Sequence, residues 1–164
     1  MTDGLDELAV RLFAIDTGSS STGAITARIA REITQWALAH GWHVRPEARV
    51  DVPTRPSRLS ARPQTGYIDV IVLRDGRQPD FAIEIDSADK PWSLAKLRHA
   101  AAAGMHSIWI RWGDDEWAGY YDDVDVIQLS VLRRSAPSPA SRQLVLWAEP
   151  ETWRGRGRGP FHGE

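Results

Sequence analysis

The 164-residue chain contains no cysteine, which excludes disulfide bonds and zinc sites built on thiolates. It has no apolar run long enough to cross a bilayer as a helix, and residues 1–4 lack the basic and then apolar pattern of a secretion signal. The cytoplasm is therefore the location that we expect, with no membrane partner.

Lysine is nearly absent as well. Lys90 and Lys96 are the only lysines among the 20 basic residues. Both directly follow one acidic segment, and this uneven distribution favours a role for at least one of them. The chain also has no Gly-rich phosphate loop, no nucleophile elbow and no dinucleotide fingerprint. Its five histidines lack metal-ligand spacing, and the net charge of −2 does not by itself indicate a nucleic-acid partner.

Hydrophobic residues make up 42% of the chain, which is enough for the core of one domain. Apolar spacing predicts helices over residues 5–15, 22–40 and 93–103, the last of them starting at Ser93 or at Pro91. It predicts strands over 42–52, 67–73, 81–86, 107–112 and 144–148, and one or two more within 117–121 and 124–132. Asp75-Gly76 indicates a hairpin. The strand–helix–strand order from 81 to 112 predicts a parallel pair with a right-handed crossover. We expect an α/β fold in which helices flank a mixed β-sheet.

Two of these predicted strands carry carboxylates where a half-buried strand favours Val or Ile. Asp69 interrupts the first, and Glu84 and Asp86 interrupt the second. Burying a charge is expensive unless another group compensates it. Residues i and i+2 of a strand share a face, so Glu84 and Asp86 point the same way, with Asp69 on the neighbouring strand. Converging carboxylates suit Mg²⁺ or Mn²⁺, which promote hydrolysis of phosphate esters.

The spacing from Asp69 to Glu84-Ile85-Asp86, within this order of elements, resembles the PD-(D/E)xK nuclease superfamily, the restriction-endonuclease-like fold. The resemblance covers residues 22–113. It implies an αβββαβ core, a single nuclease domain over residues 1–152, and a Mg²⁺-dependent (or Mn²⁺-dependent) endonuclease, with DNA favoured over RNA as the substrate. A homodimer is expected only by analogy with members that cut both strands.

The resemblance also assigns roles to single residues. Asp69 and Glu84 match the two metal-binding catalytic acids, and Glu32 on the early helix matches an additional helical acid of many members. Asp86 stands where the family has its lysine, and we expect it to assist as a metal ligand. Lys96, or as second choice Lys90, is then expected to replace the missing lysine in orienting water or stabilising the transition state.

Two arginine-rich segments are candidates for contacts with the nucleic-acid backbone. One is the loop carrying Arg55, Arg58 and Arg62. The other is the tail over residues 153–164, an Arg/Gly-rich flexible segment with Arg154, Arg156 and Arg158. Either segment can equally be a solvated surface without a partner.

Plainer interpretations exist for the acids and lysines. Asp69 and Glu84 can be polar strand residues facing solvent, Asp86 a helix cap, and Lys96 a solvated helix residue. Glu32 can be a boundary residue paired with an arginine such as Arg28. The departure at position 86 motivates a second hypothesis, a catalytically inactive nucleic-acid-binding or protein-interaction module of the same fold in a defence or mobile-element system. A third hypothesis is an RNA-cleaving, toxin-like domain.

Overall fold

The computed structural model describes residues 3–15, 21–53, 63–76, 78–113, 121–134 and 143–147. Within these residues the chain forms three helices and six strands. In chain order they are α1 (Asp3–Phe13), α2 (Thr22–Ala39), β1 (His43–Val52), β2 (Gln64–Leu73), β3 (Phe81–Asp86), α3 (Pro91–Ala102), β4 (His106–Gly113), β5 (Asp125–Arg134) and β6 (Gln143–Trp147). None of the helices in these ranges is both long and apolar enough to span a membrane.

The strands form one sheet in the order β1-β2-β3-β4-β5-β6. Strands β1, β2 and β3 pair antiparallel, β3, β4 and β5 pair parallel, and β6 returns antiparallel to β5. The predicted mixed sheet, the β2–β3 hairpin and the parallel β3–β4 pair are therefore confirmed. The α/β class is confirmed at this level.

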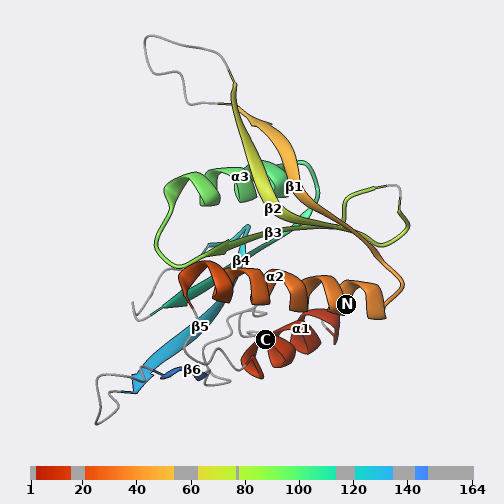
Figure 1. The fold of residues 1–164 in the computed structure, drawn as a ribbon. Helices are drawn as coiled ribbons and strands as arrows, with labels where there is room; N and C mark the ends of the chain where they lie inside the picture. Colours follow the sequence, from red (N-terminus) through yellow and green to blue (C-terminus); the bar gives the residue numbers. More distant parts are fainter. Residues whose placement is uncertain are drawn as a thin grey trace, which may run out of the picture.

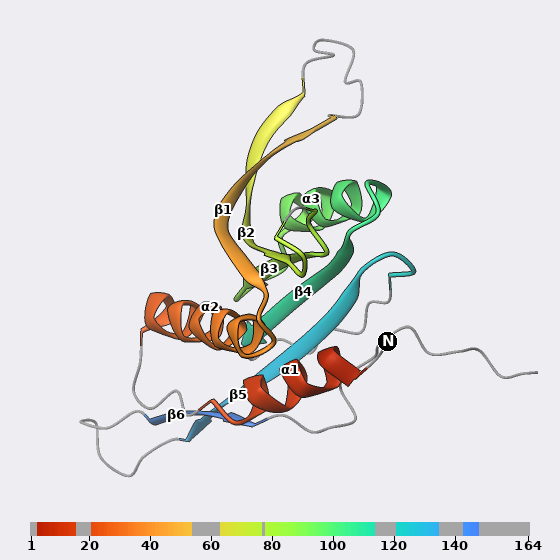
Figure 2. The same ribbon diagram turned by 90° about the vertical axis from the view of Figure 1, so that its right-hand side faces the viewer.

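Helices cover both faces of the sheet (Figures 1 and 2). Helices α1 and α2 lie on one face, where α2 buries a stripe made of Ile25, Ile29, Ile33, Trp36 and Ala37. Helix α3 lies on the other face and packs through Leu97 and Ala100. Strand β3 is buried along its whole length because it has a helical layer on each side. Any charged residue on β3 must therefore find its partner inside the protein.

Helix α3 begins at Pro91, the earlier of the two starts that the sequence left open. Pro91 occupies the first turn, and Lys90 is the residue that precedes the helix at the N-cap position. Proline favours this position because its missing N–H needs no partner there. The early start places Lys90 at the junction of the β3–α3 loop and the helix.

Strand β2 pairs with β1 over its whole length but with β3 over only a short part of it. It pairs with β1 from Leu73 to Gln64, but with β3 only from Val70 to Val72. Beyond this point the β1–β2 ribbon bends away from the sheet (Figure 2). We call this divergence of β2 and β3 the fork; beyond Val70, β2 is no longer paired with β3.

Candidate active site

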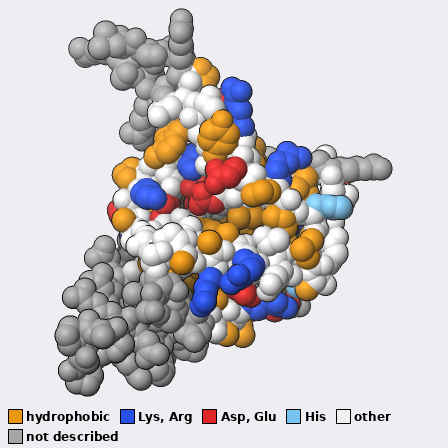
Figure 3. Space-filling view, viewed as in Figure 1, with side chains coloured by type: hydrophobic (Ala, Val, Ile, Leu, Met, Phe, Trp, Pro, Cys, Tyr) orange, Lys and Arg blue, Asp and Glu red, His pale blue; other side chains and the backbone are white. Residues whose placement is uncertain are grey.

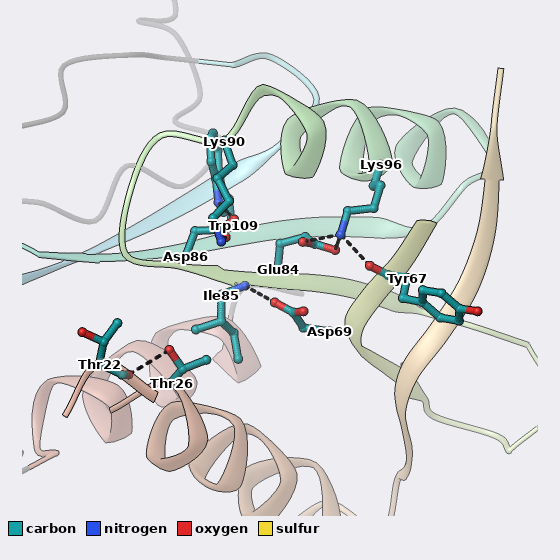
Figure 4. A network of polar contacts seen from close by, with 10 residues as sticks. All are labelled: Thr22, Thr26, Tyr67, Asp69, Glu84, Ile85, Asp86, Lys90, Lys96 and Trp109. Atoms are coloured by element: carbon teal, nitrogen blue, oxygen red, sulfur yellow. Dashed lines mark hydrogen bonds and ion pairs between the residues drawn. The ribbon is translucent and has the colours of Figure 1, made fainter. Parts of the chain in front are cut away.

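Asp69 and Glu84 occupy the fork. The last β2–β3 pair is Val70 with Ile83, so the same register places Asp69 opposite Glu84 as the next pair. Because β2 has diverged from β3 here, the side chain of Asp69, rather than the backbone of β2, accepts a hydrogen bond from the backbone of β3. Its Oδ2 accepts a hydrogen bond from the backbone N–H of Ile85 at 2.8 Å (Figure 4). The Asp69 carboxylate is thereby fixed at the edge of β3.

Glu84 is buried against α3, with only 1% of its surface exposed. The Lys96 Nζ lies 2.6 Å from Glu84 Oε1 and 2.7 Å from Oε2, and it also donates to the backbone carbonyl of Tyr67 (Figure 4). Lys96 therefore joins α3 to both arms of the fork. Burial of this ion pair holds Glu84 in one place, because each charge would be strongly destabilising without the other.

Negative charge exceeds positive charge at the fork. Burial, and to a smaller extent the nearby Asp69, raises the pKa of Glu84 to about 7, while Lys96 and Ser93 oppose the rise. Burial also raises the pKa of Asp69, while the Ile85 N–H and Lys96 oppose that rise. One ammonium thus leaves the buried Glu84 and the half-buried Asp69 incompletely compensated, which is a favourable setting for an additional cation.

The donor set at the fork fits Mg²⁺ or Mn²⁺. Glu84 Oε1 is buried and has no hydrogen-bond donor of suitable geometry within the described ranges, although it faces Lys96. The described residues contain no group of three or more acidic, histidine or cysteine side chains arranged around one point. Mg²⁺ often takes only one or two carboxylates from the protein and keeps several waters. The pair of Asp69 and Glu84 therefore meets its requirement.

Asp86 is engaged elsewhere. It is 3% exposed, its Oδ2 accepts a hydrogen bond from Trp109 Nε1 at 2.9 Å, and its Oδ1 lies 2.6 Å from Lys90 Nζ (Figure 4). Both oxygens already have partners, so the structure does not direct them to the fork. Asp86 connects β3 to β4 and to the start of α3.

Glu32 on α2 has its surroundings at the α1–α2 pair of helices. It lines a cavity of about 280 Å³ beside α1 and α2, together with Arg11, Arg28 and Arg31. These arginines provide local positive charge, which favours the interpretation of Glu32 as a residue balanced by arginine. The predicted arginine contacts at 55, 58, 62, 154, 156 and 158 lie outside the described residues.

Glu47 is an acid near the fork that the sequence pattern did not reveal. The β1–β2 register places it opposite Asp69, and its charge contributes to raising the pKa of Asp69. Its backbone φ is 48°, the only positive value for a non-glycine residue in the described ranges. Such a conformation is uncommon for glutamate. Pro46-Glu47 inside a predicted strand was the sequence signal available for this irregularity.

Acidic side chains gather near the centre of one molecular face, with basic and apolar side chains around them (Figure 3).

In comparisons with protein-family models, with curated proteins and with solved structures, nothing matches this chain. The geometry and chemistry of the fork are therefore the basis for a functional assignment.

Gly66 keeps Lys96 in position through close packing. A Cβ atom at residue 66 would lie 2.9 Å from Trp92 Cζ2 and 3.1 Å from Lys96 Cδ. We expect Gly66→Ala to displace one of these side chains and to lower the free energy of unfolding by about 1–3 kcal/mol. Urea denaturation measures this. Gly23→Ala is the control, because nothing lies within 4 Å of its Cβ position, and a stability loss of equal size there would contradict the packing argument.

The hydrogen bond from Trp109 stabilises the buried Asp86 carboxylate. Trp109→Phe keeps most of the ring but removes the donor, so one buried oxygen loses its partner. We expect a loss of about 1–3 kcal/mol in the free energy of unfolding. A double-mutant cycle with Asp86→Asn checks the cause. Full additivity of the two losses would show that they do not arise from this bond.

Proposed function

We propose that this protein is a metal-dependent nuclease that hydrolyses phosphodiester bonds in DNA. The observation that carries the proposal is the convergence of Asp69, Glu84 and Lys96 at the fork. A buried acid beside a half-buried one, with a single ammonium between them, destabilises the fold, and such arrangements are concentrated at functional sites. Asp69 and Glu84 also carry the family resemblance of the sequence, in which Lys96 is the expected replacement for the missing lysine.

The arrangement of elements supports a restriction-endonuclease-like core. The run α2-β1-β2-β3-α3-β4 has the order αβββαβ, with an antiparallel β1–β2–β3 meander and a parallel step from β3 to β4. The proposed acids lie on the second and third strands of that run, as the resemblance implies. Fold alone does not determine function, so the site residues remain the main argument.

Asp69 and Glu84 would hold Mg²⁺ or Mn²⁺ through their carboxylates. When bound, the cation supplies positive charge for the phosphate and lowers the pKa of water. The chain itself positions these ligands. The Ile85 N–H fixes Asp69, and Lys96 favours the ionised form of Glu84. Helix α3 covers Glu84 and keeps bulk water from it, which strengthens the electrostatic interactions there.

Cation affinity should depend on pH because a proton competes for Glu84. The pKa of Glu84 is about 7, raised mainly by burial. Below that value the folded protein carries a neutral Glu84, so binding of Mn²⁺ must release a proton. We expect the association constant to fall by up to about tenfold per pH unit below neutrality. Calorimetric titration of Mn²⁺ across this range measures it, and a constant affinity would contradict the assignment of Glu84.

The nuclease assay uses plasmid DNA and single-stranded RNA with Mg²⁺, with Mn²⁺ and with EDTA. We expect cation-dependent cleavage of the plasmid, which disappears in EDTA and in Glu84→Ala. Glu7→Gln on α1 is the control, because Glu7 forms only a partly exposed pair with Arg11 and His40. Cleavage that persists in EDTA or in Glu84→Ala would exclude the proposed site. Cleavage of RNA alone would reassign the substrate.

The departure at position 86 supports a second candidate function, a binding module of the same fold that does not cut. Asp86 provides no cation where the family has its lysine. The same assay separates the two functions. Salt-sensitive binding of DNA without cleavage under any cation condition would favour the binding module.

A further inference from the structure

Lys96 and Lys90, the two lysines near the fork, differ in how many of their N–H donors are free to bind a further group. An ammonium group has three N–H donors. The Lys96 Nζ donates hydrogen bonds to Glu84 Oε2 and to the carbonyl of Tyr67, and Glu84 Oε1 lies 2.6 Å away in the same ion pair. The Lys96 side chain is only 8% exposed. A substrate could bind Lys96 only by breaking a buried interaction.

Lys90 is in the opposite situation. Its side chain is 57% exposed, and among the described residues it forms one ion pair, with Asp86 Oδ1 at 2.6 Å. Two of its N–H donors therefore remain for another anion. The hydrogen bond to Asp86 raises the pKa of Lys90, and the charges of Asp69 and Glu84 act in the same direction. Lys90 thus stays protonated and lies within electrostatic reach of the fork.

Asp86 gives this exposed lysine a rigid anchor. The carboxylate is buried, and Trp109 on β4 fixes it by donating to Oδ2 at 2.9 Å. Asp86 also lies two residues after Glu84 on the same face of β3, which corresponds to about 7 Å along a strand. Figure 4 shows Trp109, Asp86 and Lys90 side by side on the same side of β3 as Glu84.

We propose that the buried Trp109–Asp86 pair positions Lys90 so that its ammonium binds a phosphate of the nucleic-acid backbone at the fork. This inference rests on the proposed function and names the residue that contacts the substrate. Asp86 is then a positioning residue rather than a metal ligand, and Lys96 stabilises Glu84.

The test compares Lys90→Ala, Asp86→Asn and the double variant. Arg98→Ala is the matched control, because Arg98 is another exposed cation of α3 in an ion pair, in its case with Asp123 at 3.5 Å. Affinity for a short DNA duplex is measured in EDTA by fluorescence anisotropy over a range of salt. Values of kcat and KM are measured with Mg²⁺. Urea denaturation of each variant reports whether the fold is retained.

Lys90→Ala should weaken DNA binding in EDTA and reduce the slope of log K against log salt by about 0.9, the value for one phosphate contact. It should also lower kcat/KM by about 10–100-fold. Asp86→Asn should leave the salt slope unchanged, since the charge of Lys90 remains, but it should lower kcat. In the Lys90→Ala background, Asp86→Asn should have no further effect on kcat, because it acts through Lys90.

Other results would overturn the inference. If Lys90→Ala matches Arg98→Ala in both salt slope and kcat/KM, Lys90 does not contact the phosphate, and hydrolysis at the fork still stands. Additive losses of kcat in the double variant would make Asp86 a structural residue. A wild-type protein that binds DNA through Lys90 but cleaves nothing would overturn the proposed hydrolysis while it supports the phosphate contact.

Discussion

Replacement of Lys96 by methionine should lower the free energy of unfolding by about 3–5 kcal/mol at about pH 8. Methionine preserves most of the aliphatic stem, so the variant tests the charge rather than the packing. The loss of the ammonium leaves the buried Glu84 and the half-buried Asp69 without their cation. The carbonyl of Tyr67 also loses its donor from α3.

The effect should be much smaller at about pH 5, and the sign follows from linkage. The pKa of Glu84 in the folded protein, about 7, lies above its ordinary value of 4.5. The folded state therefore binds the proton more tightly than the unfolded state does. Lys96 lowers this pKa, so its removal raises the pKa further. The free energy of unfolding of Lys96→Met therefore rises as the pH falls through the folded-state pKa of Glu84. It falls again as the pH rises back through that pKa.

Urea denaturation of wild type and Lys96→Met at both pH values measures the difference. Arg98→Met is the control, because its ion pair with Asp123 is exposed and should contribute no more than about 1 kcal/mol. Equal destabilisation by Lys96→Met at both pH values would show that its role is packing alone. It would remove the electrostatic basis of the site.

Asp69→Asn and Glu84→Gln should each lower kcat by about 10²–10⁴-fold, which corresponds to several kcal/mol of transition-state stabilisation. Each change removes one negative charge and nearly preserves the shape of the side chain. In Asp69→Asn the amide oxygen of the new side chain can still accept the hydrogen bond from the Ile85 N–H, so the fork should keep its geometry. The loss is then attributable to the ligand charge and not to unfolding.

Asp51→Asn provides the control within the same hairpin. Asp51 is exposed and accepts a hydrogen bond from Thr65 at 2.6 Å, away from the fork. Steady-state cleavage of plasmid DNA with Mg²⁺ and urea denaturation are measured for all three variants. An Asp69→Asn protein with wild-type kcat would contradict the proposed role of that acid.

The sequence pattern sufficed for the mixed sheet, for the parallel step through α3 and for placing Asp69 and Glu84 on neighbouring strands. Periodicity predicted α2, because its apolar stripe is regular, and the crossover through α3 required β3 and β4 to be parallel. Acids placed in apolar strands predicted a compensated site at Asp69 and Glu84. In each case the local sequence and the tertiary structure impose the same requirement.

Other features depend on long-range contacts that no local pattern encodes. The divergence of β2 from β3 arises where the β1–β2 ribbon bends, and it converts the Asp69 side chain into a partner of the Ile85 N–H. The bond between Trp109 and Asp86 joins residues on different strands. Glu32 illustrates the reverse problem: its place at the edge of the helix stripe fits the fork and the α1–α2 cavity equally well, and only the tertiary contacts separate the two.

The central claim is that Asp69 and Glu84 form a site for a divalent cation. Calorimetric titration of Mn²⁺ into the metal-free protein, at a pH above the Glu84 pKa, tests this claim most directly because it requires no knowledge of the substrate. The account predicts Mn²⁺ binding by the wild type, and its loss in Asp69→Asn and in Glu84→Gln but not in Asp51→Asn. Equal binding by the wild type and both fork variants, or no binding by the wild type, would contradict it.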